Sequence, residues 1–153
     1  QTTIAENQKK KKYTVLIVED NTDVRNHITS NLSSMYNIIT ASNGAEAVDK
    51  AIDKLPDLII SDLMMPKRDG MEMCTTLKND LRTSHIPVIM LTALAMFSDI
   101  KEGYKTGADD YITKPFDSSV RIARVENIIQ AREKLKEIYG KKFSLDTLGV
   151  EAT

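Results

Sequence analysis

Acidic, hydroxyl and basic residues stand at the ends of four of the five short apolar runs in this chain of 153 residues. Glu19 and Asp20 follow the first run, Asp62 the third, Thr92 the fourth and Lys114 the fifth. Close carboxylates repel each other by about 1 kcal/mol or more per pair, so we expect Mg²⁺, a hard cation that prefers oxygen ligands, to bind among them. Carboxylates, a divalent cation, a lysine and a hydroxyl group can together transfer a phosphoryl group, with Asp62 as the expected nucleophile.

The five apolar runs alternate with helical patterns, and this order predicts an α/β fold with an open, doubly wound sheet. Runs of about five residues, apolar on both faces, are typical of parallel strands covered by helices on both sides. Ligands of such sheets bind beyond the carboxyl ends of the strands, and Asp62 falls at the centre of that edge. The expected strands are 14–18, 37–41, 57–61, 87–91 and 110–113, and the expected helices cover about 22–35, 47–55, 70–81 and 97–106, with a long helix from near 117.

Each candidate residue taken alone also has an ordinary structural explanation. An acid after a strand is often a helix N-cap, so Asp20, Asn21 or Thr22 could cap the first helix. Lys114 and Pro115 could form a plain turn. The occurrence of such residues at four strand ends, on the edge where the fold binds ligands, favours a functional site.

Composition excludes several other classes of protein. The 21 Lys and Arg residues against 22 Asp and Glu residues give a net charge of −1, so we expect no direct nucleic-acid binding by this domain. The single cysteine, Cys74, excludes an internal disulfide framework and a cysteine zinc site. The apolar runs are far shorter than the roughly 20 residues that span a bilayer, so we expect a cytoplasmic segment without membrane contact. Because the first residue is Gln, we expect a piece of a longer protein, whose parent chain could be membrane-anchored.

The chain resembles the receiver domain of two-component response regulators from residue 13 to about 133. The matching motifs are VLIVEDN (15–21), PDLIISDLMMPKRDG (56–70), IPVIMLTA (86–93) and GADDYITKPF (107–116). The resemblance implies a flavodoxin-like fold of five parallel strands in the order 2-1-3-4-5 with five helices. The segments TSHIPVIMLTA and KEIYGKKFS look like receivers inside hybrid sensor histidine kinases, a group in which an AraC-type DNA-binding domain often follows.

The resemblance assigns a role to each acidic residue of the site. Asp62 would be the phosphoacceptor, and Glu19, Asp20, Asp62 and the backbone carbonyl of Met64 would hold Mg²⁺, with Mn²⁺ as the other candidate ion. Glu19 stands where many relatives have Asp, and it would bind the ion directly or through a water molecule. Met64 and Leu94 would flank the path of the attacking water, and because both are bulky and apolar we expect slow self-dephosphorylation.

The resemblance also assigns roles to the last two strand ends. Thr92 would donate its hydroxyl to one phosphoryl oxygen and Lys114 would pair with another. The Lys114–Pro115 bond is expected to be cis. Thr92 and Tyr111 would act as the switch, which repacks the face formed by the helix near 97–106, the strand 110–113 and the last helix.

The expected function is that of a phosphoacceptor signalling domain. A phosphohistidine domain of a histidine kinase would supply the phosphoryl group, and a DNA-binding output domain in the same parent chain would respond. We expect residues 1–12 to be a linker, 13–133 the receiver, and 134–153 an extended last helix and linker towards the output domain. By itself the chain is not expected to be an enzyme, apart from catalysing its own phosphorylation and dephosphorylation.

The last helix is expected to run past the domain body. Val125, Ile128, Leu135 and Tyr139 form a heptad-like pattern, and Gly140 is expected to end the helix. The protruding part could be a frayed tail, or it could dock on another subunit or lead to an output domain.

Charged residues near the same helix allow two interpretations, one of which is a homodimer. Arg121 and Arg124 could pair with Asp109 and Asp110 across a dimer, through the switch face, or they could form a solvated surface.

Three alternatives compete with this interpretation. A haloacid dehalogenase-type hydrolase needs a second acid two residues after the nucleophile, where this chain has Met64. A nucleotide-binding domain needs a glycine-rich first turn, where this chain has residues 19–23, EDNTD. A degenerate receiver that never accepts phosphate would lack some of the functional set, but this chain has all of it.

Overall fold

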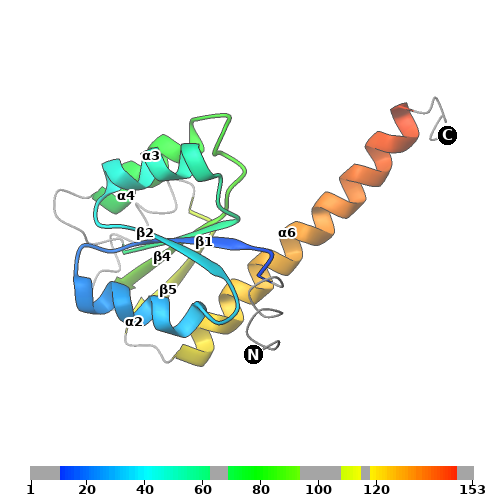
Figure 1. The fold of residues 1–153 in the computed structure, drawn as a ribbon. Coiled ribbons are helices and arrows are strands. Elements are labelled where there is room, and N and C mark those ends of the chain that lie inside the picture. The colour runs from blue at the N-terminus through cyan, green and yellow to red at the C-terminus, as the bar shows by residue number, and fades with distance from the viewer. Residues whose placement is uncertain (1–10, 63–68, 94–107, 115–117, 148–153) are drawn as a thin grey trace.

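One five-stranded parallel sheet organises the protein (Figure 1). The computed structural model describes residues 11–62, 69–93, 108–114 and 118–147. The strand order is β2-β1-β3-β4-β5, which confirms the predicted α/β fold and its order. The strands are β1 (Thr14–Val18), β2 (Asn37–Ala41), β3 (Leu58–Asp62), β4 (Val88–Ala93) and β5 (Asp110–Lys114).

Four of the five predicted helices fall within the described residues. They are α2 (Thr22–Leu32), α3 (Gly44–Lys54), α4 (Asp69–Lys78) and α6 (Ser118–Thr147). The helix predicted near 97–106 lies outside the described residues. In Figure 1, α2 and the first part of α6 cover one face of the sheet, and α3 and α4 cover the other.

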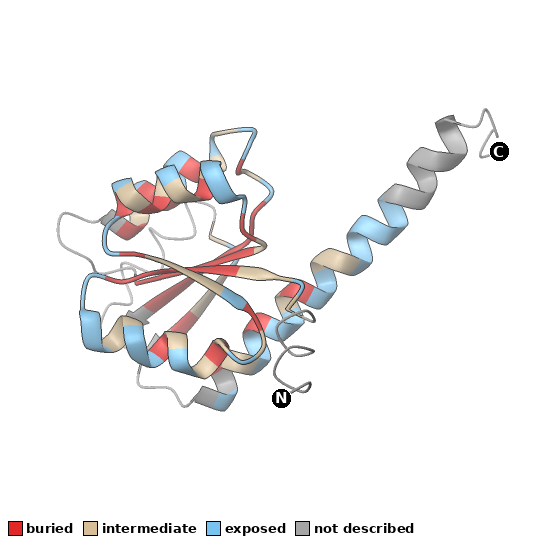
Figure 2. Ribbon diagram, viewed as in Figure 1, coloured by how far each residue is buried: buried red, intermediate tan, exposed pale blue. Residues whose placement is uncertain are grey.

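Alternating side chains of the strands fill two apolar cores, one on each face of the sheet. Figure 2 shows that the strands of the sheet are largely buried. On β1, Leu16 and Val18 join the core beneath α3 and α4, whereas Val15 and Ile17 join the core beneath α2 and α6. This alternation follows from the period of two in a strand. Burial of each large aliphatic side chain contributes about 1.5–3 kcal/mol, so both helix layers are held firmly against the sheet.

Asparagine side chains start the two helices that follow β1 and β2. Oδ1 of Asn21 accepts a hydrogen bond from Val24 N at 3.0 Å, so among the three predicted candidates Asn21 is the cap of α2. Oδ1 of Asn43 accepts one from Glu46 N at 2.8 Å and caps α3. Each cap satisfies an N–H group that has no partner inside the helix.

Three predicted helix ends were wrong. The helix α4 ends at Lys78, three residues earlier than predicted. The helix α2 ends at Leu32, three residues earlier than predicted, where Ser33 N still donates to Thr29 O. The helix α6 continues through Gly140 to Thr147. Glycine weakens a helix interior by about 1 kcal/mol, but it keeps the N–H group that proline lacks, so the helical hydrogen bonds are not interrupted.

The helix α6 leaves the domain body after about four turns (Figure 1). Val125 and Ile129 are buried in the core beneath α2 and α6. Further along, Leu135, Ile138 and Tyr139 are 54%, 56% and 66% exposed. The Arg132 side chain lies between these two parts, and its Nη1 donates to the carbonyl oxygen of Asp57 at 2.6 Å. Arg132 therefore attaches α6 to the start of β3 at the point where the helix leaves the body.

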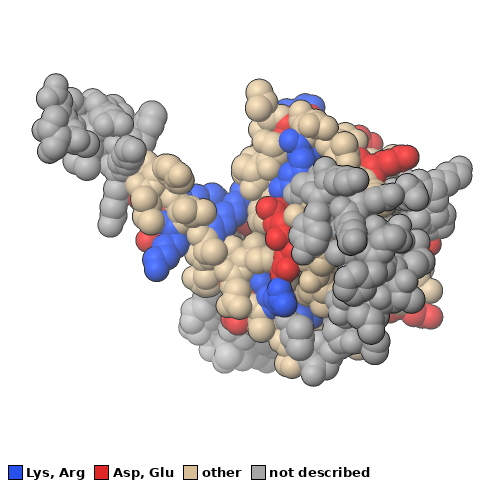
Figure 3. Space-filling view, turned by 180° about the vertical axis from the view of Figure 1, so that it is seen from behind, with Lys and Arg blue, Asp and Glu red and all other residues tan. Residues whose placement is uncertain are grey.

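The structure describes one chain, so the predicted dimer through the four charged residues stays a prediction. Asp110 accepts a hydrogen bond from Arg124 of the same chain at 2.7 Å, and Asp109 pairs with Lys78 of α4 at 2.9 Å. Arg121 is only 5% exposed. Figure 3 shows Lys and Arg side chains next to Asp and Glu side chains on the body beside α6. The described ion pairs of Arg124 and Asp109 thus join elements within one chain.

Candidate functional site

The ends of β1 and β3 bring the three candidate carboxylates together. The two strands are parallel neighbours, and Val18 at the end of β1 is paired with Ser61 on β3. Glu19 and Asp62, the next residues of the two strands, therefore extend from the same edge of the sheet. This edge is the carboxyl end of the strands, where ligands of open α/β sheets bind.

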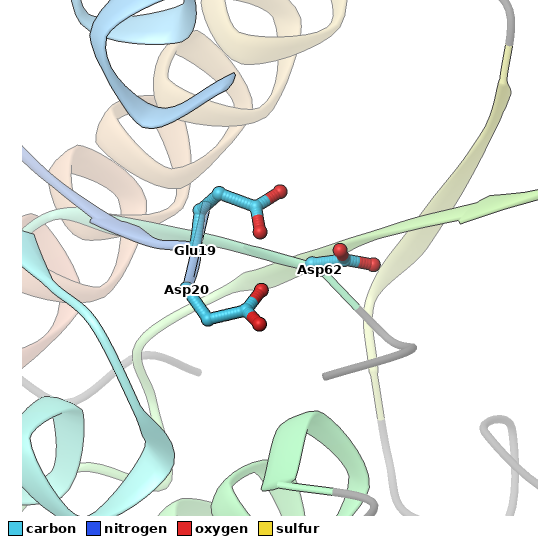
Figure 4. A group of neighbouring side chains, drawn as sticks. All are labelled: Glu19, Asp20 and Asp62. Atoms are coloured by element: carbon cyan, nitrogen blue, oxygen red, sulfur yellow. The ribbon is translucent and has the colours of Figure 1, made fainter. Parts of the chain in front are cut away.

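Glu19, Asp20 and Asp62 form a compact acidic cluster (Figure 4). One carboxylate oxygen from each residue lies within 4.8 Å of the others. Figure 4 shows the three side chains turned towards a common space, two from the end of β1 and one from the end of β3. Glu19 is 2% and Asp62 is 8% exposed, whereas Asp20 is exposed, so the cluster is open to solvent on the Asp20 side.

The acidic cluster fits the requirements of a small divalent cation. Oxygen atoms that bind one Mg²⁺ at about 2.1 Å can be at most about 4.2 Å apart, so the cluster has to close only slightly. Three acidic groups without a cation would repel one another, and two of them are buried, where a charge is costly. Carboxylate oxygens are the ligands that Mg²⁺ and Mn²⁺ prefer, and among the described residues this cluster could therefore hold either ion.

Hydrogen bonds from three segments hold Glu19. Its backbone N–H donates to Ala41 O at the end of β2, at 3.0 Å. Its Oε2 accepts from Asn21 N at 3.2 Å, and its carbonyl oxygen accepts from Nη1 of Arg25 at 2.7 Å. The backbone that carries Glu19 and Asp20 is thus fixed to β2 and to α2.

Asp62 is fixed by the strand that carries it. All five residues of β3 are buried, and Asp62 is paired across the sheet with Leu91 of β4. The hydroxyl of Ser61 donates to the carbonyl oxygen of Asp62 at 3.1 Å. A site on a buried central strand is held more precisely than a site on a loop, so the carboxylate of Asp62 starts from a well-defined backbone.

The backbones of Thr92 and Lys114 lie at the same edge of the sheet. Thr92 follows Leu91, the partner of Asp62, and Lys114 is paired with Ala93. The positions of their side chains are outside what the structure describes, and so are Met64, Leu94 and Pro115 with its predicted cis bond. The roles of these five residues therefore stay predictions.

Tyr111 is the predicted switch residue that the structure describes with its surroundings. It lies on β5 beside Met90 of β4 and packs, half-buried, against the core beneath α3 and α4. The structure presents one state, so the predicted movement of Tyr111 stays a prediction.

The sequence interpretation did not identify Arg25. The pattern that could have indicated its role is a basic residue five positions after Asp20, in the first turns of α2. Helical geometry directs a side chain at that position back towards the amino end of the helix, where the acidic pair lies.

Comparisons with known proteins agree with the fold described above. A family model described as the response regulator receiver domain matches residues 15–126. A histidine kinase of Formosa agariphila is 45% identical over 127 residues, which cover 83% of this chain and 9% of the kinase. The DNA-binding dual master transcriptional regulator RpaA of Synechocystis is 39% identical over 124 residues, which cover 80% of this chain and 52% of the regulator. This chain thus corresponds to only a part of either relative.

A solved structure gives the same result for the fold. The signal receiver domain of a signal transduction histidine kinase from Syntrophus aciditrophicus is 38% identical, with a TM-score of 0.73. The match covers 78% of this chain and 91% of that domain.

Proposed function

Because this chain belongs to the response regulator receiver domain family, we propose that it accepts a phosphoryl group from a histidine kinase on the carboxylate of Asp62. One observation supports the proposal above all. Carboxylate oxygens of Glu19, Asp20 and Asp62 lie within 4.8 Å of one another at the ligand-binding edge of an α/β sheet. Membership of this family also decides against the hydrolase and the nucleotide-binding alternatives.

In the proposed reaction the acidic residues have two roles, cation binding and nucleophilic attack. When bound, Mg²⁺ supplies positive charge that offsets the charge of the phosphoryl oxygens and of the carboxylates. Glu19, Asp20 and Asp62, with the backbone carbonyl of Met64, would hold the cation, and Asp62 would also present an oxygen to phosphorus. Thr92 and Lys114 donate hydrogen bonds to the phosphoryl oxygens, a role that the position of their backbones at the same edge supports.

The proposed transfer exchanges one bond to phosphorus for another. An oxygen of Asp62 forms a bond to phosphorus while the bond from phosphorus to a histidine nitrogen of the kinase breaks. The electron pair of the broken bond stays on that nitrogen, and the ring, protonated at its other nitrogen, leaves as neutral imidazole. The product is an acyl phosphate on Asp62. Met64 and Leu94 then slow its hydrolysis by crowding the path of water.

Phosphorylation of Asp62 would switch the face that contains β5 and α6. The new group adds negative charge and three acceptor oxygens, which draw the hydroxyl of Thr92 and leave space for Tyr111 to turn inward. The half-buried position of Tyr111 on β5 supports this role, because a small repacking is enough to bury or expose the ring. The same face could also mediate a homodimer.

We further propose that the receiver controls an output domain in a longer protein. The relative from Synechocystis is described as a DNA-binding transcriptional regulator, and the relative from Formosa agariphila as a histidine kinase. The part of α6 beyond Arg132 is a suitable connection, because it leads away from the domain body. An AraC-like output domain and a cytoplasmic location stay predictions. In the described part of the chain, no helix has both the length and the apolar character that crossing a membrane requires.

The proposal is tested by incubating the chain with Mg²⁺ and acetyl phosphate and measuring the intact mass. We expect the mass of one phosphoryl group to be added, and we expect a chelator of divalent cations to abolish the addition. Asp62→Asn should prevent it, whereas the matched variant Asp53→Asn, at an exposed position of α3, should not. Failure of the wild-type chain to gain this mass would favour the degenerate receiver and contradict the proposal.

A further inference from the structure

Arg25 connects the first helix to the strand end that carries the acidic pair. Its Nη1 donates to the carbonyl oxygen of Glu19 at 2.7 Å, and its Nη2 lies 3.4 Å from Oγ1 of Thr22. The side chain is half-buried at the start of α2. None of the steps of the proposed transfer uses this residue.

The bond from Arg25 differs from the other two hydrogen bonds of Glu19 described above in the groups that form it. The bonds to Ala41 O and from Asn21 N involve backbone groups, which most substitutions keep. The bond from Arg25 is the one among these three that depends on another residue's side chain. It is also charge-assisted, and such bonds are roughly twice as strong as bonds between neutral groups.

We propose that Arg25 is a positioning residue for the cation site: it fixes the backbone of Glu19 so that the carboxylates of Glu19 and Asp20 converge on one ion. This inference rests on the proposed function, because it assigns Arg25 to the site that function requires. The carboxylate oxygens of the cluster are already within 4.8 Å of one another without an ion. A site preformed in this way avoids the entropic cost of ordering its ligands when the cation binds.

Electrostatics alone would give Arg25 the opposite effect. A guanidinium group close to the acidic cluster repels an incoming cation, so loss of its charge should strengthen cation binding. Loss of its hydrogen bond should weaken binding, because the backbone at Glu19 becomes freer. A residue that only stabilises the start of α2 would change the free energy of unfolding and leave the cation affinity of the folded protein unchanged. Loss of Arg25 should therefore raise the Mg²⁺ affinity if its charge dominates, lower it if Arg25 positions Glu19, and leave it unchanged if Arg25 only stabilises α2.

The test is the Mg²⁺ affinity of the folded chain, measured by calorimetric titration alongside thermal unfolding. Arg25→Met removes the charge and the donor but keeps a flexible stem, and we expect its affinity to fall about tenfold. Arg25→Lys keeps a charged donor and should recover part of the loss. Arg82→Met is the matched control, because Arg82 pairs with Asp80 in the loop before β4, at the opposite edge of the sheet, and it should bind as the wild type does.

A second measurement distinguishes a positioning role of Arg25 from a direct role in the phosphoryl transfer. The rate of phosphorylation by acetyl phosphate should be reduced in Arg25→Met at low Mg²⁺ and should return to the wild-type rate at saturating Mg²⁺. If Arg25→Met does not fold, Arg25→Gln carries the test with the same expected loss. Unchanged or tighter Mg²⁺ binding by the folded variant would overturn the positioning role while leaving the proposed function intact. A wild-type chain that binds no Mg²⁺ would overturn both.

Discussion

At the scale of single residues, the acidic cluster favours cation binding but lowers the stability of the metal-free fold. Glu19 and Asp62 are buried, and Asp20 completes a set of three carboxylates within 4.8 Å of one another. Without a cation these groups repel one another. Removal of one charge should therefore help the metal-free fold and harm the site, which is the usual relation between activity and stability at a functional site.

Asp20→Asn provides a test of this relation. We expect the variant to bind Mg²⁺ at least tenfold more weakly, which corresponds to about 1.4 kcal/mol, because the ion loses a charged ligand. We also expect the metal-free variant to unfold at a higher temperature than the wild type. Calorimetric titration and thermal unfolding measure the two effects.

The control for this variant is Asp23→Asn. Asp23 is also exposed and lies in the first turn of α2, but it is outside the acidic cluster. An equal loss of Mg²⁺ affinity in both variants would mean that the general negative charge near α2, rather than the cluster, attracts the cation.

Leu55 is a single residue whose backbone is strained. It follows α3 with φ 48° and ψ 63°, in the left-handed region, and its side chain is 52% exposed. This conformation costs an L-residue about 1–2 kcal/mol, whereas glycine adopts it freely but has more conformational entropy to lose on folding. We therefore expect Leu55→Gly to stabilise the protein by about 0.5–1 kcal/mol in urea unfolding.

Lys54→Gly is the matched variant for that prediction. Lys54 is the last residue of α3, and glycine should there cost up to about 1 kcal/mol. If both glycine substitutions destabilise the protein, the left-handed geometry at Leu55 is not a source of strain.

At the scale of elements, the start of α3 shows how a short segment fixes a helix end. Asn43 caps the helix, and Glu46 reaches back so that its Oε1 accepts from Ser42 N at 2.7 Å. The hydrogen bond from the Ser42 backbone is the main cause that lowers the pKa of the Glu46 carboxyl below its ordinary value of 4.5, and nearby Lys50 lowers it further. The charged form of Glu46 is therefore favoured in the folded state.

The pH dependence of stability follows from this shift. A carboxyl group with a lowered pKa contributes stability above its unfolded pKa of 4.5, and the contribution is lost as pH falls through the lower folded value. Glu46→Gln should therefore be less stable than the wild type at pH 7, and the difference should shrink below pH 4.5. Urea unfolding at a series of pH values checks this.

Asn43→Ala supplies the contrast at the same helix end. It removes a neutral cap and should cost about 1 kcal/mol at every pH. A loss of stability in Glu46→Gln that is the same at pH 7 and at pH 3 would contradict the role of the Glu46 charge.

Elements with strong local signals were predictable from the sequence. The strands were predicted within one or two residues, because each is a short apolar run with an abrupt polar end. The ends of α2 and α4 and the continuation of α6 beyond Gly140 could not be predicted, because helix ends depend on local hydrogen bonds that a single residue type does not decide.

The candidate site was predictable to a similar degree. Its three carboxylates could be predicted because parallel strands end at one edge. The bond from Arg25 to the Glu19 carbonyl could not, because a bond to a backbone carbonyl leaves no pattern of residue types.

At the scale of the whole molecule, Arg132 marks a boundary between two parts of α6. Before it, Val125 and Ile129 are buried, and after it Leu135, Ile138 and Tyr139 are exposed. Helices of fewer than about 12–15 residues are marginal in water without packing. We therefore expect backbone amides beyond residue 134 to exchange hydrogen far faster than those at 125–129 in dilute protein.

The concentration dependence of this exchange distinguishes a frayed tail from docking on a second copy of the chain. A frayed tail should stay unprotected at high protein concentration, whereas docking on a second copy should slow the exchange of residues 134–139. Strong protection of these residues in dilute, monomeric protein would contradict the boundary at Arg132.

The central claim is that Asp62 carries the phosphoryl group, and the most direct test is to locate that group. The chain is treated with Mg²⁺ and acetyl phosphate and then with borohydride, which reduces an aspartyl phosphate to homoserine, and its peptides are analysed by mass spectrometry. We expect homoserine at position 62 and unchanged aspartate at position 20. Homoserine at another position, or at none, would contradict the proposed function.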